Sequence, residues 1–210
     1  MLKQEALLRI TQGVTKFQNQ VFPSQREMFE RLRHRQNPLA LFVTCADARV
    51  VPNLFTQTDP GEIFIERNPG NMVPPYVEFV GGVTAGVEYA MLALNIPVII
   101  VCGHTDCGVM KALLHPESAK RMPGVQKWIS HGLTACERML RKYRDAPEEE
   151  RLTRLTEYNV LEQIENLKTH PSVDMRLRKG EVEIRGWVYD IGDGSIRQAK
   201  QDSGEFVPLE

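Results

Sequence analysis

The stretch that decides the fold is VIIVCGHTDCG, residues 98–108. It opens with an unbroken apolar run and passes directly into a cluster of polar and metal-binding side chains. A short apolar run without alternation is typical of a strand buried on both faces, as in a parallel sheet. We therefore predict a buried strand over residues 98–102, with His104 and Cys107 just beyond its carboxyl end.

The same organisation recurs in LALFVTCADAR, residues 39–49. Its apolar run predicts another buried strand, which ends in Cys45 and a C-x-D-x-R motif. In open α/β sheets, ligands bind in the crevice beyond the carboxyl ends of the strands. If the two strands are neighbours, the sulfurs of Cys45 and Cys107 and the imidazole of His104 meet in one place.

The rest of the chain alternates between strand and helix patterns. Further strands are expected at residues 62–66 and 181–191, the second leading into a hairpin, and helices at about 24–35 (with Ser24 in a capping box), 83–94 and 125–168, the last broken at 145–147. Such alternation indicates an α/β fold with a mainly parallel sheet flanked by helices and an additional C-terminal edge strand or hairpin. Since the sequence contains no internal repeat or linker, we expect residues 1–210 to form a single domain.

Composition and charge argue against several classes of protein. Apolar residues make up 42% and charged residues 25%, and the net charge of −1 gives no reason to expect nucleic acid or an anionic membrane as a partner. The amino terminus has no secretory signal pattern, and the apolar run at residues 96–102 is far too short to span a bilayer. We therefore expect a cytoplasmic protein.

The cysteines are Cys45, Cys102, Cys107 and Cys136. In a reducing compartment, spaced cysteines are more often metal ligands or buried small residues than disulfides. Cys45 and Cys107, together with His104, suit zinc, because soft thiolates and imidazole prefer zinc to calcium or magnesium. Three protein ligands leave a fourth position for water, as in a catalytic zinc site. We interpret Cys102 and Cys136 as packing residues.

Asp47 and Arg49 are candidate catalytic residues beside this metal. Asp47 lies two positions after Cys45, so an extended backbone directs both side chains to one side, where the carboxylate could accept a hydrogen bond from zinc-bound water. Arg49 could hold that carboxylate in a bidentate pair. The alternative is a purely structural ion pair. Asp106 is expected to cap a helix that begins near Cys107.

At these residues the sequence resembles a known family, the β-class carbonic anhydrases. The motifs that carry the resemblance are C-x-D-x-R, H-x-x-C-G, ERNPGN at 66–71, VEYA at 87–90, THPSV at 169–173 and GWVYDI at 186–191. Together they cover about residues 36–196, and the last two resemble bacterial members, including those encoded with cyanate-degrading enzymes. Two alanines, Ala46 and Ala48, replace the usual serines of the first motif, and Pro69 replaces a small or β-branched residue.

The resemblance implies reversible hydration of carbon dioxide to bicarbonate and a proton, by attack of zinc-bound hydroxide oriented by an Asp–Arg dyad. It also implies one zinc ion per subunit, inhibition by inorganic anions, and a homodimer or multiple of dimers. The N-terminal helices, about residues 1–36, are expected to pack on a partner subunit.

The resemblance also assigns substrate-binding roles to Gln36, Phe64 and Tyr89. Gln36 could instead be an ordinary helix residue, and the two aromatic residues could belong to the core. The allosteric, closed-site subgroup carries a tryptophan where this chain has Phe42, so the resemblance favours the plant-like, open-site subgroup. In a closed form, Asp47 would become the fourth metal ligand.

Rival functions remain open at this point. The same scaffold could hydrolyse carbon disulfide or carbonyl sulfide. A non-catalytic zinc module would have a closed site, binding zinc without any hydration rate. A thiol-redox protein is the third possibility, although the sequence has no C-x-x-C motif.

Overall fold

The computed structural model describes residues 2–77 and 81–209. The chain divides into two compact units, Met1–Gln36 and Asn37–Glu210. The first unit contains the helices α1 (Lys3–Lys16), α2 (Phe22–Ser24) and α3 (Arg26–Leu32), with a π-helical turn, η1 (Phe17–Val21), after α1. The expected capping box is wrong: α3 begins at Arg26, and the Ser24 hydroxyl donates to the Val21 carbonyl, at 2.7 Å, because Ser24 already lies inside the preceding helical segment.

Helix α1 has an apolar stripe and no buried residue. Leu7, Ile10 and Val14 recur at helical spacing and are 63%, 65% and 51% exposed. A stripe of this kind is typical of a helix that packs against another surface.

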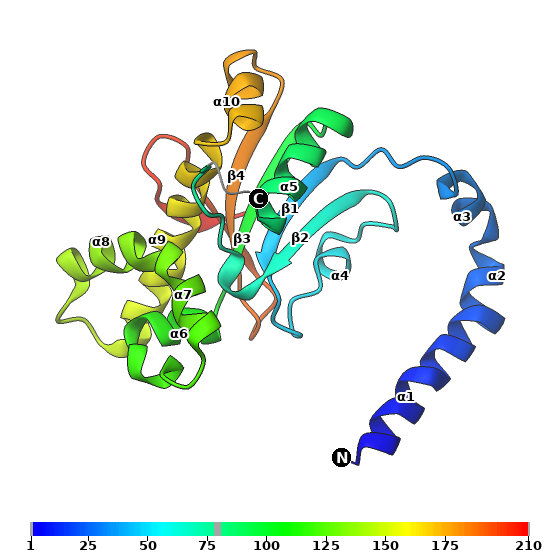
Figure 1. The fold of residues 1–210 in the computed structure, drawn as a ribbon, viewed down its shortest axis with the longest axis horizontal. Helices are drawn as coiled ribbons and strands as arrows, with labels where there is room; N and C mark the ends of the chain where they lie inside the picture. Colours follow the sequence, from blue (N-terminus) through cyan, green and yellow to red (C-terminus); the bar gives the residue numbers. More distant parts are fainter. Residues whose placement is uncertain (1, 78–80, 210) are drawn as a thin grey trace. The chain divides into compact units, whose positions relative to one another are not determined.

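The second unit is built on a six-stranded sheet (Figure 1). Its strands are β1 (Ala40–Cys45), β2 (Ile63–Asn68), β3 (Val98–His104), β4 (Glu183–Tyr189), β5 (Ile196–Ala199) and β6 (Phe206–Pro208), in the spatial order β2-β1-β3-β4-β5-β6. The first four strands run parallel, and β5 and β6 add an antiparallel edge. The predicted parallel α/β sheet with a C-terminal hairpin is confirmed.

Helices connect and cover these strands. They are α4 (Pro52–Thr56), α5 (Gly82–Glu88), α6 (Gly108–Leu114), α7 (Pro123–Ile129), α8 (Leu133–Tyr143), α9 (Glu148–Lys168) and α10 (Pro171–Arg178), with short 3-10 or π-helical turns η2 (Pro69–Asn71), η3 (Tyr89–Ala93), η4 (Pro116–Ala119) and η5 (Ser130–Gly132). The predicted break at residues 145–147 separates α8 from α9. Within the described ranges, no helix combines the length and the apolar character needed to cross a bilayer.

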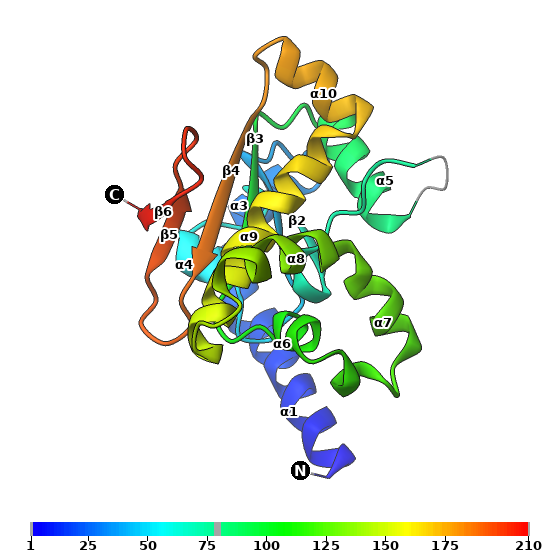
Figure 2. The same ribbon diagram turned by 90° about the vertical axis from the view of Figure 1, so that its left-hand side faces the viewer.

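Both faces of the central strands are apolar, as expected for a parallel sheet. Leu41 and Val43 of β1 belong to a core cluster that includes residues of α5, α9 and α10, whereas Phe42 faces the other side, 5.9 Å from the Phe55 ring of α4. Helix α9 lies across β3 and β4 (Figure 2). It comes so close that a Cβ added at Gly103 would lie 2.9 Å from Val160 Cγ2.

The strand order places two functional strand ends side by side. Strand β1 has β2 on one side and β3 on the other, so the direction of the connections reverses between β1 and β3. At such a switch point, the crevice beyond the carboxyl ends of the strands is the usual ligand site of open α/β sheets. Cys45 is the last residue of β1, and His104 is the last residue of β3.

Candidate metal centre

Three side chains with ligand chemistry converge at this switch point. Cys45 and His104 end their strands, and Cys107 is the N-cap residue of α6. One donor atom of each lies within 4.8 Å of the others, and all three residues are buried. The structure therefore brings together the set that the sequence predicts as metal ligands.

The imidazole of His104 is oriented as a metal ligand would be. Its Nδ1 lies 2.8 Å from the carbonyl oxygen of Thr105, which is the usual way in which one ring nitrogen is fixed as a donor. Its Nε2 is buried and has no hydrogen-bond partner in the part of the chain that the structure describes. A buried ring nitrogen without a partner is costly, so the donor set fits a cation bound at Nε2.

The two thiols shift each other's pKa in opposite directions. The neighbouring Cys107 thiol lowers the pKa of Cys45, as do His104 and the backbone amide of Gly70, which lies 3.3 Å from the Cys45 sulfur. The same contact and burial raise the pKa of Cys107. A divalent cation requires both sulfurs as thiolates, so its binding would displace the remaining proton.

The η2 turn, which contains Gly70, is held in place by hydrogen bonds from side chains of α7 and α9. Gly70 has a φ of +78°, in the left-handed region, and its carbonyl accepts a hydrogen bond of 3.1 Å from the buried Asn159 amide of α9. The Trp128 indole donates to the Pro69 carbonyl at 2.8 Å. Pro69 begins the short η2 turn, where its missing N–H costs nothing, so this departure from the family pattern fits the local backbone.

Asp47 and Arg49 form the bidentate pair that the sequence predicts. Arg49 Nε donates to Asp47 Oδ1 at 3.0 Å, and Nη2 donates to Oδ2 at 2.8 Å. The guanidinium lowers the pKa of the Asp47 carboxyl well below its usual range. Asp47 Oδ2 lies 4.0 Å from His104 Nε2, so an ionised carboxylate lies beside the candidate ligand cluster.

Arg67 is a site residue to which the sequence analysis assigned no role. Its Nε donates to the Cys45 carbonyl at 3.2 Å, and its Nη2 donates to the Asp47 carbonyl at 2.8 Å. These contacts fix the backbone that carries a ligand and the carboxylate. The sequence could have indicated a role for Arg67, because this residue belongs to the ERNPGN motif.

Asp106 does not cap α6, so that expectation is wrong. The N-cap residue is Cys107, and no side chain caps this helix. Asp106 has a φ of +59°, and its Oδ2 accepts a hydrogen bond from Arg49 Nη1, at 2.9 Å. Its second oxygen contacts Lys111 Nζ.

The residues expected to bind substrate lie in different units. Phe64 of β2 and Tyr89 of η3 have ring centroids 6.0 Å apart in the second unit. Gln36 is the last residue of the first unit, and its side chain is exposed. Cys102 and Cys136 are buried free thiols, and burial raises the pKa of Cys102 to about 12, as suits packing residues.

Comparisons with known proteins agree with this geometry. The carbonic anhydrase family profile matches residues 40–196. The carbonic anhydrase of Pseudomonas aeruginosa is 43% identical over 200 residues, covering 95% of this chain and 90% of that protein. The structure of the β-carbonic anhydrase CcaA aligns with a TM-score of 0.94 and 38% identity, over 97% of this chain and 100% of that one. One of two tetrameric β-carbonic anhydrases from the ascomycete Sordaria macrospora aligns with a TM-score of 0.82 and 26% identity, over 92% and 96%.

The fold is a mainly parallel α/β sheet, and the site at its switch point is a buried Cys-His-Cys cluster that could hold a metal ion. Because the family profile and these relatives span most of the chain, the protein belongs to the β-class carbonic anhydrases and is an enzyme of that family.

Proposed function

We propose that this protein catalyses the reversible hydration of carbon dioxide to bicarbonate and a proton at one zinc ion per subunit. The proposed ligands are Cys45, His104 and Cys107. The observation that carries the proposal is the buried Nε2 of His104, which has no partner among the described residues and lies beside two thiols and the Asp47 carboxylate.

Zinc, when bound, supplies a Lewis acid that makes water acidic enough to act as a nucleophile near neutral pH. The Thr105 carbonyl holds the His104 ring so that Nε2 faces the cluster. Asp47 accepts a hydrogen bond from the attacking water and so directs the oxygen lone pair towards the carbon of the substrate. Arg49 keeps Asp47 ionised and in place through its two hydrogen bonds.

We further propose that the site is of the open, plant-like kind. Both carboxylate oxygens of Asp47 accept hydrogen bonds from Arg49, which favours a carboxylate that contacts water over one that ligates the metal. Phe42, where the closed subgroup has tryptophan, supports the same assignment. Within that subgroup, we assign the chain to the bacterial members, since its motifs resemble those of members linked to cyanate degradation.

The substrate is proposed to lie against Phe64 and Tyr89, whose apolar rings suit an uncharged molecule such as carbon dioxide. Gln36 would donate its amide N–H to a substrate oxygen. Inorganic anions are expected to inhibit, because they compete for the same metal position.

The proposed assembly is a homodimer or a multiple of dimers in which residues 1–36 pack on a partner subunit. We also propose that residues 1–210 form one domain. The exposed stripe of Leu7, Ile10 and Val14 supports this contact, and tetrameric relatives exist among the structures to which the chain is similar. We propose the cytoplasm as the compartment, since the cysteines are free thiols.

The test is stopped-flow hydration of carbon dioxide together with metal analysis of the purified protein. We expect about one zinc ion per chain, as in a catalytic site with three protein ligands, and a rate that chelation abolishes and zinc restores. Cys107→Ser should lose both metal and rate. The matched control is Cys136→Ser, which removes a buried thiol outside the cluster and keeps a donor for the Leu113 carbonyl.

Two outcomes would contradict the proposal. Stoichiometric zinc without any hydration rate would indicate a structural metal. Sulfide release from carbonyl sulfide in the absence of carbon dioxide hydration would indicate a different substrate.

A further inference from the structure

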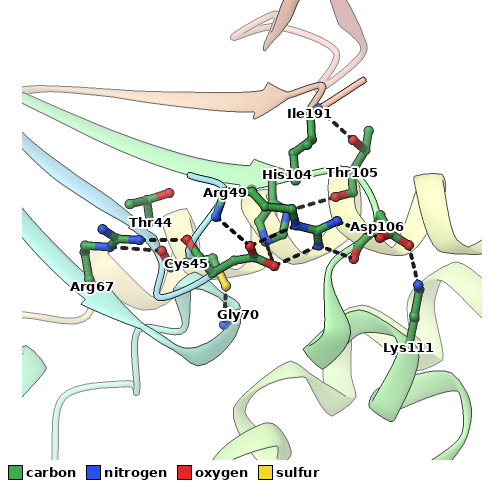
Figure 3. Close-up of polar contacts among 12 residues, drawn as sticks. Thr44, Cys45, Arg49, Arg67, Gly70, His104, Thr105, Asp106, Lys111 and Ile191 are labelled. Atoms are coloured by element: carbon green, nitrogen blue, oxygen red, sulfur yellow. Dashed lines mark hydrogen bonds and ion pairs between the residues drawn. The ribbon is translucent and has the colours of Figure 1, made fainter. Parts of the chain in front are cut away.

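The guanidinium of Arg49 lies between two carboxylates. On one side it donates from Nε and Nη2 to Asp47. On the other side it donates from Nη1 to Asp106 Oδ2, at 2.9 Å, and from Nη2 to the Asp106 backbone carbonyl, at 3.2 Å. Figure 3 shows Asp106 to the right of Arg49, with Lys111 below Asp106. The plane of the guanidinium is thus fixed from two directions.

Asp106 is itself fixed by its backbone and by a lysine. Its φ of +59° belongs to the left-handed region, which aspartate and asparagine tolerate better than most residues. The carboxylate oxygen that does not face Arg49 contacts Nζ of Lys111, a residue of α6. The two cations lower the pKa of the Asp106 carboxyl, Lys111 more than Arg49.

We propose that Asp106, braced by Lys111, is a positioning residue that holds Arg49 against Asp47. This inference rests on the proposed function, in which Asp47 orients the attacking water. The Arg49 side chain is 46% exposed, so without Asp106 the guanidinium could rotate towards solvent and release Asp47. Lys111 offsets the charge of Asp106, so Asp106 competes less with Asp47 for the guanidinium.

If Asp106 only stabilised the fold, its loss would lower the unfolding midpoint rather than turnover. The side chains of Asp106 and Lys111 are 52% and 49% exposed, and exposed ion pairs contribute little to stability. The loss of Asp106 should therefore reduce turnover while leaving the unfolding midpoint and the zinc content unchanged.

The test uses the zinc-loaded enzyme and two substitutions at Asp106. Asp106→Gly removes the carboxylate and accepts the left-handed backbone without strain, whereas Asp106→Asn keeps an acceptor for Arg49. We expect Asp106→Gly to lower kcat by about fivefold, the scale of one exposed ion pair, and Asp106→Asn to restore most of the rate. The control Asp174→Gly removes another exposed carboxylate paired with an arginine, Arg178, and should keep the full rate.

A double-mutant cycle with Arg49→Ala tests whether Asp106 acts through Arg49. In the Arg49→Ala enzyme, Asp106→Gly should cause no further loss. Two results would overturn the positioning role of Asp106 while leaving the Asp–Arg dyad intact. In both, Arg49→Ala is slow; in the first, Asp106→Gly keeps the full rate, and in the second, the double variant loses the product of the two single losses. A full rate for Arg49→Ala would instead contradict the proposed Asp–Arg dyad, and with it this inference.

Discussion

Asp47 is the residue whose replacement separates metal binding from catalysis. Asp47→Asn keeps the shape of the side chain but loses its charge and one of the oxygens that Arg49 holds. Because Asp47 is not among the proposed ligands, zinc content should stay at the wild-type level. Turnover should fall by about a hundredfold, within the range for a lost proton acceptor. Stopped-flow kinetics with metal analysis measures both quantities.

Asp174→Asn is the matched control, since both carboxylate oxygens of Asp174 also accept hydrogen bonds from an arginine, here from Nε of Arg178 on α10. It should behave as wild type. An Asp47→Asn enzyme with unchanged turnover would remove Asp47 from the mechanism, and one without zinc would make it a ligand.

The pH dependence of turnover is also a residue-scale prediction. Arg49 holds the pKa of Asp47 well below its usual range, so this carboxylate is ionised throughout pH 6–9. Turnover should nevertheless rise with pH on the alkaline side of neutrality, because the attacking water must lose a proton and the two proposed thiolate ligands would reduce the charge of the metal. A flat profile between pH 6 and 9 at constant ionic strength would contradict this.

The lowered pKa of Asp47 also determines how the stability of the fold changes with pH. A carboxyl with a lowered folded-state pKa stabilises the fold above its unfolded pKa of about 4, and this stabilisation is lost as pH falls further. The ion pair of Asp47 with Arg49 should therefore stabilise the protein throughout the assay range and fail only in acid. The difference in urea unfolding between wild type and Asp47→Asn should shrink progressively as pH falls below about 4, and a difference that does not shrink would contradict the assignment.

At the scale of an element, the η2 turn couples the fold to the metal site. A Cβ added at Gly70 would lie 2.6 Å from Val109 Cγ1, and the φ of +78° disfavours any other residue. We expect Gly70→Ala to lower the free energy of unfolding by about 1–3 kcal/mol. It should also weaken zinc binding, because the amide that donates to Cys45 shifts. Chemical denaturation and competition with a chromophoric chelator measure the two effects.

Two further variants test the cause. Gly124→Ala is the control, since an added Cβ there meets no described atom within 4 Å. Gly70→Ala with Val109→Ala relieves the clash but not the backbone strain, so part of the stability should return. If Gly70→Ala bound zinc as tightly as wild type, the η2 turn would not contribute to the metal site, and the prediction would be contradicted.

The elements also show why the sequence predicted some features and not others. Strands β1 and β3 and the residues that end them follow from local apolar runs, so Cys45 and His104 were identifiable without tertiary information. The contact of Arg49 with Asp106 joins residues 57 positions apart, and that of Trp128 with Pro69 joins residues 59 apart. The helix cap predicted at Asp106 failed for the same reason: its left-handed backbone and its partners have no local pattern.

At the scale of the whole molecule, the apolar stripe of α1 predicts the assembly. Leu7→Lys places a charge on the proposed subunit contact and should weaken association by about tenfold or more, because an unpaired buried charge is costly. Gln12→Lys introduces the same charge on the opposite side of the helix and should leave association unchanged. Analytical ultracentrifugation across a concentration series measures the difference. Identical sedimentation of the two variants would contradict the role of the stripe.

The most direct test of the central claim is a crystal structure of the zinc-loaded protein, with anomalous diffraction recorded at the zinc edge. We predict one peak per chain, with the sulfurs of Cys45 and Cys107 at about 2.3 Å and Nε2 of His104 at about 2.0–2.1 Å. Asp47 should remain paired with Arg49 and leave the fourth position to solvent. A peak elsewhere, or a fourth position filled by Asp47 or another side chain, would contradict the account.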